Sequence, residues 1–162
     1  MSRPRSFLRT FVRVRFHECD PLGHLNNAIY LGYLEQAAID HAALAGWPAD
    51  RLKTEFGAAF LARRHDIEFL QPAFENDILE ITTWPETMGG ARAIRHYLIR
   101  KVESSGHVVP PPVLESGRQL VKPGREELVV RASTEWAFTN LDRGRVMRMP
   151  RSLIDDFQEP DT

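Results

Sequence analysis

Residues 18–38, ECDPLGHLNNAIYLGYLEQAA, contain a turn that leads directly into a long apolar segment. Asp20 precedes a proline, which disfavours helical backbone at that position, and Gly23 permits a tight or left-handed bend. The side chain of Asn26 or Asn27 can accept a hydrogen bond from one of the free backbone N–H groups that begin a helix. The stretch therefore predicts a turn followed by a helix over residues 27–45.

This helix is apolar around nearly its whole surface, which is typical of a buried helix. Gly46 and Pro48 supply the usual end signals, and Gly32 would let a sheet pack closely against the helix. Apolar or aromatic residues recur at helical spacing, and most of the remaining positions are also apolar: Tyr30, Leu34, Ala37, His41 and Leu44, then Ile29, Leu31, Ala38, Ile39, Ala42 and Ala43.

The rest of the chain alternates between apolar and polar residues with the period of a β-strand. In the first strand, residues 11–17, Val12, Val14 and Phe16 share one face. Four further strands are expected at 58–69, 76–86, 92–103 and 127–142, with a short strand or end segment at 144–150. One domain of α+β architecture is the resulting prediction.

Two segments break this alternation. Residues 104–124 contain three consecutive prolines and three glycines, and they are expected to form an extended loop or mobile insertion. Residues 156–162 are expected to be a polar tail. Trp84, Tyr97 and Trp136 are expected in the core or at an interface.

Composition excludes several classes of protein. The 162-residue chain is 43% hydrophobic with a net charge of −1, so no global positive field would attract nucleic acid or an anionic membrane. No apolar run reaches the roughly 20 residues of a membrane span. The single cysteine excludes an internal disulfide framework and fits a cytoplasmic location. The basic residues 1–9 lack a signal-peptide core, and a transit peptide is the weaker reading.

The turn is also a candidate hydrolytic site. The free N–H groups of the first helical turn form a partial positive pole close to Asp20. Such donors can stabilise negative charge on a thioester carbonyl oxygen, while the carboxylate activates water or attacks directly. The alternative is that these residues form only a turn and a helix cap.

The same stretch closely resembles the start of hotdog-fold acyl-CoA thioesterases of the 4-hydroxybenzoyl-CoA thioesterase-like group. The segments IEFLQPAFENDILEITT and STEWAFTNLDRGRVMRMP resemble later strands of that family. The similarity covers residues 10–103 and 127–152, whereas the insertion at 104–124 departs from the family pattern. The resemblance implies a hotdog fold, in which an antiparallel sheet of about five strands wraps one long helix. It also implies a homodimer or homotetramer with active sites at the interface.

The resemblance places Asp20 at the catalytic carboxylate, as general base or nucleophile, with the backbone N–H near Asn27 polarising the carbonyl. His24 would shape the loop or touch the acyl group, and Tyr30 would line the pocket. The substrate would be an acyl-CoA or acyl carrier protein thioester, with no metal and no cofactor beyond coenzyme A as part of the substrate. Candidate ligands for the coenzyme A phosphates, chosen because arginine binds phosphate through a fork of donors, are Arg63, Arg64, Arg92 and Arg95.

Several alternatives stay open. Glu35 on the helix is a backup catalytic acid, because related enzymes carry their carboxylate there. Cys19 as a nucleophile, or zinc bound by His17, Cys19 and His24, are weaker readings, since neither a paired base nor a fourth ligand is evident. At the level of function, the main alternative is a non-catalytic acyl-CoA-binding or regulatory hotdog module; a hotdog hydratase or dehydratase is weaker.

Overall fold

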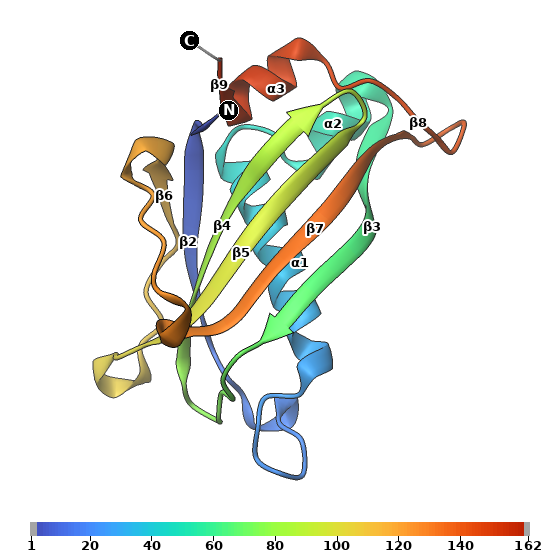
Figure 1. Cartoon of the computed structure of the whole chain (residues 1–162). Helices are drawn as coiled ribbons and strands as arrows, with labels where there is room; N and C mark the ends of the chain where they lie inside the picture. The colour runs from blue at the N-terminus through green and yellow to red at the C-terminus, as the bar shows by residue number, and fades with distance from the viewer. Residues whose placement is uncertain (1–2, 161–162) are drawn as a thin grey trace.

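The computed structural model describes residues 3–160 and contains a seven-stranded antiparallel sheet with the long helix α1 against one face (Figure 1). The strand order is β3-β7-β5-β4-β2-β6, and β8 pairs with β7. The elements of this sheet are β2 (Ser6–Arg13), β3 (Ala58–Phe69), β4 (Ile78–Gly89), β5 (Arg92–Val102), β6 (Val113–Ser116), β7 (Leu128–Asn140) and β8 (Arg145–Val146). Residues of β2, β3, β4, β5 and β7 share one core with α1 (Asn27–Leu44), which confirms the predicted α+β architecture of an antiparallel sheet packed on a long helix.

The main core lies between α1 and the sheet. Side chains of the helix that recur every three or four residues, including Tyr30, Leu34 and Ala37, pack against alternating residues of the strands such as Leu79 and Ile99. This periodic match explains why the pattern of apolar residues located both element types correctly.

The helix is not buried all round, so that part of the prediction is wrong. Ile39 is 53% exposed, and Leu44 is 51% exposed. A side chain added at Gly32 would meet open space, so no sheet packs closely there. The sheet covers only one face of α1, which leaves an apolar face uncovered in a single chain.

The first strand begins and ends earlier than expected. β2 stops at Arg13, and residues Phe16–Glu18 form a 3₁₀ turn, η1. Val14 is buried as predicted, but Phe16 is 78% exposed because the chain has left the sheet by then.

Two short helices were not predicted. α2 (Ala49–Phe56) follows α1 directly, and α3 (Arg151–Phe157) precedes β9 (Gln158–Glu159), which pairs with β1 (Arg3–Pro4). The prediction of a polar tail is wrong for residues 156–160, since Phe157 and Gln158 are buried, and residues 161–162 lie outside the described part of the chain. These helices close a second core around Trp47 and Phe138.

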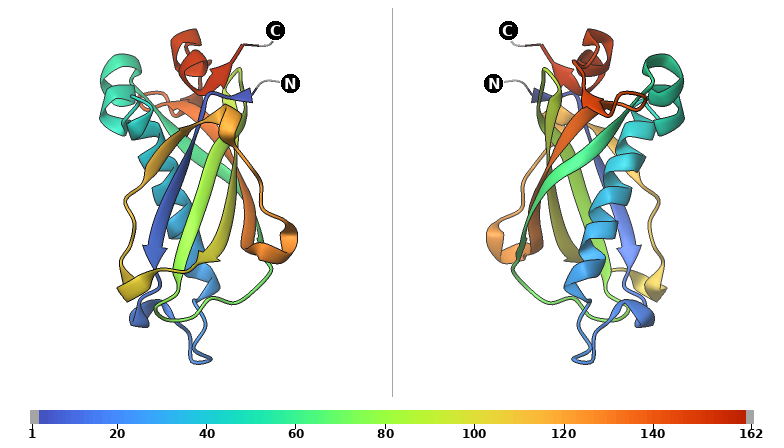
Figure 2. Two further views of the ribbon diagram at one scale, coloured as in Figure 1. Left: turned by 90° about the vertical axis from the view of Figure 1, so that its left-hand side faces the viewer. Right: turned by 90° about the vertical axis from the view of Figure 1, so that its right-hand side faces the viewer.

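The segment 104–124 is more structured than the expected loop. Its strand β6 pairs with β2 and becomes the edge of the sheet, and Leu120 packs on a cluster formed by Phe7, Trp84, Leu98 and Leu128. The segment lies beside and over the face of the sheet opposite to α1 (Figure 2). Gly117 is required here, because an added Cβ would overlap the Pro4 carbonyl oxygen. Between residues 3 and 160, no helix is long and apolar enough to cross a membrane.

Candidate active site

The turn at Asp20 is closed by its own backbone. One carboxylate oxygen, Oδ1, accepts hydrogen bonds from the backbone N–H of Leu22 at 2.9 Å and of His24 at 3.1 Å. The Asp20 N–H donates to the His24 carbonyl at 2.8 Å, and Gly23 adopts a φ of +82°. The second oxygen, Oδ2, has no hydrogen-bond partner within residues 3–160, so the carboxylate is oriented but keeps one oxygen for a ligand.

The turn is anchored to the body of the protein on both sides. The Leu25 N–H donates to the Ala73 carbonyl at 2.8 Å, and the His24 ring meets the Phe74 ring edge-on with 5.1 Å between centroids. The Asn26 N–H donates to the Glu18 carbonyl at 2.9 Å. These contacts hold Asp20 relative to the start of α1.

Asn26 is the residue that caps the helix. Its Oδ1 accepts from the Ala28 N–H at 2.9 Å, which makes Asn27 the first helical residue. The Asn27 N–H has no acceptor in the described part of the chain. A free donor at the positive end of an 18-residue helix suits a carbonyl oxygen that gains negative charge.

One cleft of about 470 Å³ brings the predicted residues together. Its floor includes Tyr30, which is buried and packs edge-on against Phe69 at 5.6 Å. Burial raises the pKa of Tyr30 to about 12, so its hydroxyl stays protonated at neutral pH. The lining residues are Asp20, His24, Leu25, Asn26, Asn27, Tyr30, Phe69, Leu70, Gln71 and Pro72.

A buried carboxylate under the turn was missed by the sequence reasoning. Glu18 is only 4% exposed, and its Oε1 accepts from the Tyr33 hydroxyl at 2.8 Å and from Arg15 Nε at 3.1 Å. Burial alone would raise the pKa of Glu18, but the hydrogen bonds from Arg15 and Tyr33 outweigh it and lower that pKa. The available signal was Tyr33 itself, because a tyrosine on the buried stripe of a helix needs a partner for its hydroxyl.

The arginines and Glu35 do not join the Asp20 cleft of their own chain. Arg63 and Arg64 lie exposed on β3, at an irregularity in its pairing with β7. Arg92 forms a 2.6 Å ion pair with Glu135 and borders another cavity. The Glu35 side chain is about half exposed on α1 and lies 3.9 Å from His65 Nε2.

Cys19 lies in surroundings unsuited to a nucleophile. Its thiol contacts the Arg15 carbonyl at 3.7 Å, and burial together with nearby carboxylates raises the pKa of Cys19. Within residues 3–160, no group of three or more histidines, cysteines, aspartates or glutamates is arranged to hold a metal ion.

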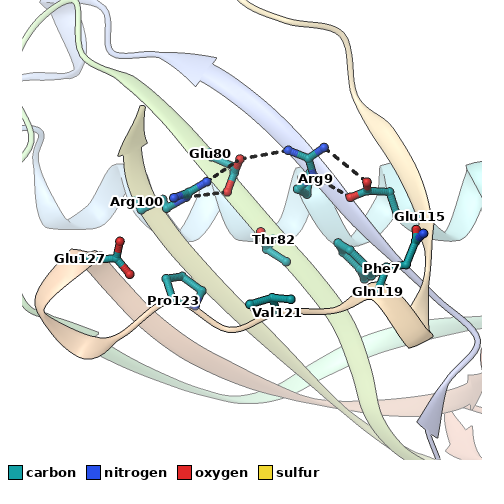
Figure 3. A pocket seen from close by; sticks show the side chains of 10 residues that line it. All are labelled: Phe7, Arg9, Glu80, Thr82, Arg100, Glu115, Gln119, Val121, Pro123 and Glu127. Atoms are coloured by element: carbon teal, nitrogen blue, oxygen red, sulfur yellow. Dashed lines mark hydrogen bonds and ion pairs between the residues drawn. The ribbon is translucent and has the colours of Figure 1, made fainter. Parts of the chain in front are cut away.

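A separate polar cavity of about 310 Å³ lies under the insertion (Figure 3). Two arginines reach the buried carboxylate of Glu80, with Arg9 Nη1 at 3.3 Å and Arg100 Nε at 2.8 Å. Arg9 also binds Glu115 of β6 at 2.6 Å. Because these guanidinium groups are paired with carboxylates, the cluster holds the insertion onto the sheet rather than offering free cations to a phosphate.

Comparison with known proteins places these features in context. The sequence matches the thioesterase-like superfamily over residues 14–159. Over 102 residues it is 31% identical to the long-chain acyl-CoA thioesterase FadM of Escherichia coli strain K12, a match that spans 63% of this chain and 75% of that one.

Solved structures show the same fold. A mutant of 4-hydroxybenzoyl-CoA thioesterase complexed with 4-hydroxybenzoyl-CoA superimposes with a TM-score of 0.74 at 20% identity, covering 94% of this chain and 98% of the other. The DHNA-CoA thioesterase of Staphylococcus aureus superimposes with a TM-score of 0.70 at 17% identity, covering 92% and 85% of the two chains.

Proposed function

Because the chain belongs to the thioesterase-like superfamily, we propose that it hydrolyses acyl-CoA thioesters in the cleft that holds Asp20. The observation that carries the proposal is the shared cleft of an oriented carboxylate and a helix start. A carboxylate and a free backbone donor are the two groups that thioester hydrolysis needs.

In the proposed reaction, the thioester carbonyl oxygen accepts a hydrogen bond from the Asn27 N–H. Asp20 removes a proton from a water molecule as that water attacks the carbonyl carbon. The negative charge that develops on the carbonyl oxygen is stabilised by the helix N-terminus, and collapse of the intermediate expels coenzyme A as a thiolate. In the nucleophilic variant, Asp20 attacks the carbonyl carbon itself and displaces coenzyme A as a thiolate. Water then hydrolyses the resulting anhydride to the free acid and the regenerated Asp20 carboxylate.

The other predicted residues receive supporting roles. His24, held against Phe74, shapes the mouth of the cleft, and the protonated Tyr30 lines its floor. No metal or redox cofactor takes part. Coenzyme A or an acyl carrier protein would carry the acyl group, and a reducing cytoplasm fits both this substrate and the single cysteine.

Assembly would complete the site. Within the described chain β3 pairs only with β7, so its outer edge is free. We propose that two protomers pair along this edge and form one continuous sheet. The result would be a homodimer, or the dimeric unit of a homotetramer. Arg63 and Arg64 on β3 would then lie at the interface, where they can bind coenzyme A phosphates of a substrate held by either protomer.

A panel of acyl-CoA substrates with a thiol-detecting dye tests the activity. Asp20→Asn is nearly isosteric but cannot act as a base, so kcat should fall about 10²- to 10⁴-fold while the fold is retained. Asp142→Asn, at an exposed turn, is the matched control and should keep wild-type kcat.

The outcomes separate the candidate functions. Near-wild-type kcat for Asp20→Asn would move the catalytic role to Glu35. Tight binding of acyl-CoA with no release of coenzyme A from the wild-type protein would instead favour a non-catalytic binding module. Oxygen-18 transfer from water into Asp20 during a single turnover would identify the nucleophilic variant.

A further inference from the structure

An apolar cavity of about 390 Å³ lies between the second half of α1, α2 and the adjoining end of the sheet. Its walls include Trp47, Phe60 and Met88, and also Ile39 and Leu61 on the face where a partner protomer is proposed to pack. The cavity shares no lining residue with the Asp20 cleft of the same chain. The volume lies in the range of about 300–1,000 Å³ that is usual for small-molecule sites.

A buried cation borders this apolar cavity. Arg95, on β5, is only 8% exposed. One nitrogen of its guanidinium group, Nη1, donates to His41 Nδ1 at 2.8 Å and to Thr83 Oγ1 at 3.2 Å. Because arginine can only donate, His41 Nδ1 must be the acceptor, and the proton of the neutral ring is on Nε2, which donates to Ser6 Oγ at 2.9 Å.

Arg95 has no carboxylate partner among residues 3–160, since no ion pair in this part of the chain includes it. Burial lowers the pKa of Arg95 to about 10, which still leaves the side chain charged at neutral pH. Glu35 also borders the cavity, but its side chain is about half exposed and lies next to His65. An unpaired buried charge is costly, and arginines that serve only structure are usually paired when buried.

The remaining donors of Arg95 are free for a ligand. Its Nε and Nη2 hydrogens have no protein acceptor in the described chain. In residues 3–160, three side-chain polar atoms are both inaccessible to solvent and without a hydrogen-bond partner: Tyr97 Oη, Trp136 Nε1 and Gln158 Oε1. Arg95 Nε and Nη2 are not among them, so these two nitrogens are not sealed in the packed core. The Nε and Nη2 hydrogens form one edge of the guanidinium fork, which matches the two oxygens of a carboxylate.

We propose that this cavity binds an organic acid with an apolar chain, whose carboxylate pairs with Arg95 while the chain lies against the apolar walls. The charge of the ligand would compensate the unpaired guanidinium group, and its chain would fill the cavity. The inference does not depend on Asp20 or on thioester hydrolysis.

Wild-type protein and three ligands with the same chain test the proposal directly. Binding of decanoate, decanol and decyltrimethylammonium is measured by calorimetry and by the fluorescence of Trp47 and Trp136, which both line the cavity. Decanoate should bind about 10- to 100-fold more tightly than decanol, as expected for a hydrogen bond between charged groups. Decyltrimethylammonium should not displace bound decanoate. Equal affinity for decanoate and decanol, or no binding of decanoate, would overturn the proposal.

Two pairs of variants locate the binding site. Ala49 is exposed at the first position of α2, where an acidic residue suits the helix N-terminus, so Ala49→Glu should fold normally. The added charge should weaken decanoate binding about 2- to 5-fold relative to the neutral Ala49→Gln. Arg95→Gln should remove the preference for decanoate over decanol, whereas Arg131→Gln, an exposed arginine of β7, should retain it. Unchanged affinity in both Ala49→Glu and a folded Arg95→Gln would contradict the assignment.

The carboxylate could belong to a free acid or to the far end of an acyl group. The free acid predicts direct binding of decanoate, unaffected by Asp20→Asn. A distal carboxylate predicts that Arg95→Gln lowers kcat/KM for decanedioyl-CoA and leaves kcat/KM for decanoyl-CoA unchanged. Absence of decanoate binding would reject the site in either form, whereas loss of thioesterase activity alone would reject only the proposed function.

Discussion

Glu18 and Asp20 stand two residues apart and have opposite surroundings. Glu18 points into the core, where Arg15 and Tyr33 use its oxygens, whereas Asp20 is partly exposed and is held by backbone donors. A carboxylate whose oxygens are occupied can orient its neighbours but cannot take a proton from a substrate. Glu18 therefore positions Arg15 and Tyr33, whereas Asp20 carries out the chemistry under the proposed mechanism.

His41 predicts a dependence of stability on pH. Burial, reinforced by the charge of Arg95, holds the pKa of His41 well below its ordinary value of 6.5. Below pH 6.5 the unfolded chain therefore binds a proton that the folded chain does not, so stability falls as the pH decreases. The contribution of this residue is at most about 1.4 kcal/mol per pH unit.

Chemical denaturation at pH values from 7.5 to 5 measures this effect. His41→Asn keeps an acceptor near the position of Nδ1 but does not titrate, so its free energy of unfolding should decrease less steeply on acidification than that of the wild type. Identical slopes for the two proteins would show that His41 does not titrate on unfolding.

At the scale of elements, the insertion adds a layer to a sheet that is complete without it. The core between α1 and the sheet contains no residue of 104–124. The segment contributes β6, the Arg9–Glu115 ion pair and the cover that Leu120 provides over Trp84.

Deletion of residues 106–122 should therefore leave a protein that unfolds cooperatively. Since β5 and β7 are antiparallel neighbours, a short connection can join them. The free energy of unfolding should fall by about 1–3 kcal/mol because apolar surface becomes exposed and one ion pair is lost. The free energy of unfolding is measured by urea denaturation, with circular dichroism as the signal. Glu115→Gln serves as a control that removes only the ion pair. Insoluble or non-cooperative material would show that the segment is integral to the fold.

At the scale of the whole molecule, the two edges of the sheet differ. β6 and the charged cluster beneath it cover one edge, whereas the 12-residue strand β3 leaves the other free beside the exposed apolar face of α1. Long free edges are usually paired or protected in natural proteins. This asymmetry supports assembly through β3.

Light scattering coupled to size-exclusion chromatography tests this assembly with two matched leucines. Leu61 on β3 is 47% exposed, and Leu114 on β6 is 40% exposed. Leu61→Glu should convert the oligomer to smaller species and, if the site is shared, lower activity with it. Leu114→Glu should change neither. A monomeric wild-type protein, or an oligomer that survives Leu61→Glu, would argue against the β3 interface.

Local sequence patterns determined much of the secondary structure of this protein. The start of α1, the whole of β3 and the turn around Asp20 follow from periodicity, proline, glycine and capping rules, since these depend on neighbours a few residues away. The residues of the candidate site cluster because they are close in sequence, from Asp20 to Tyr30. The family resemblance supplied their proposed roles.

The tertiary structure alone decided which groups are buried and what they pair with. It placed β6 beside β2, exposed one face of α1, and joined Arg95 to His41, which is 54 residues away in the chain. Such partnerships depend on the packing of distant elements, and a local pattern carries no information about them. Residues 18–38 specify a turn and a helix, whereas the cleft around Asp20 exists only because the end of β3 and the residues that follow it pack opposite that turn.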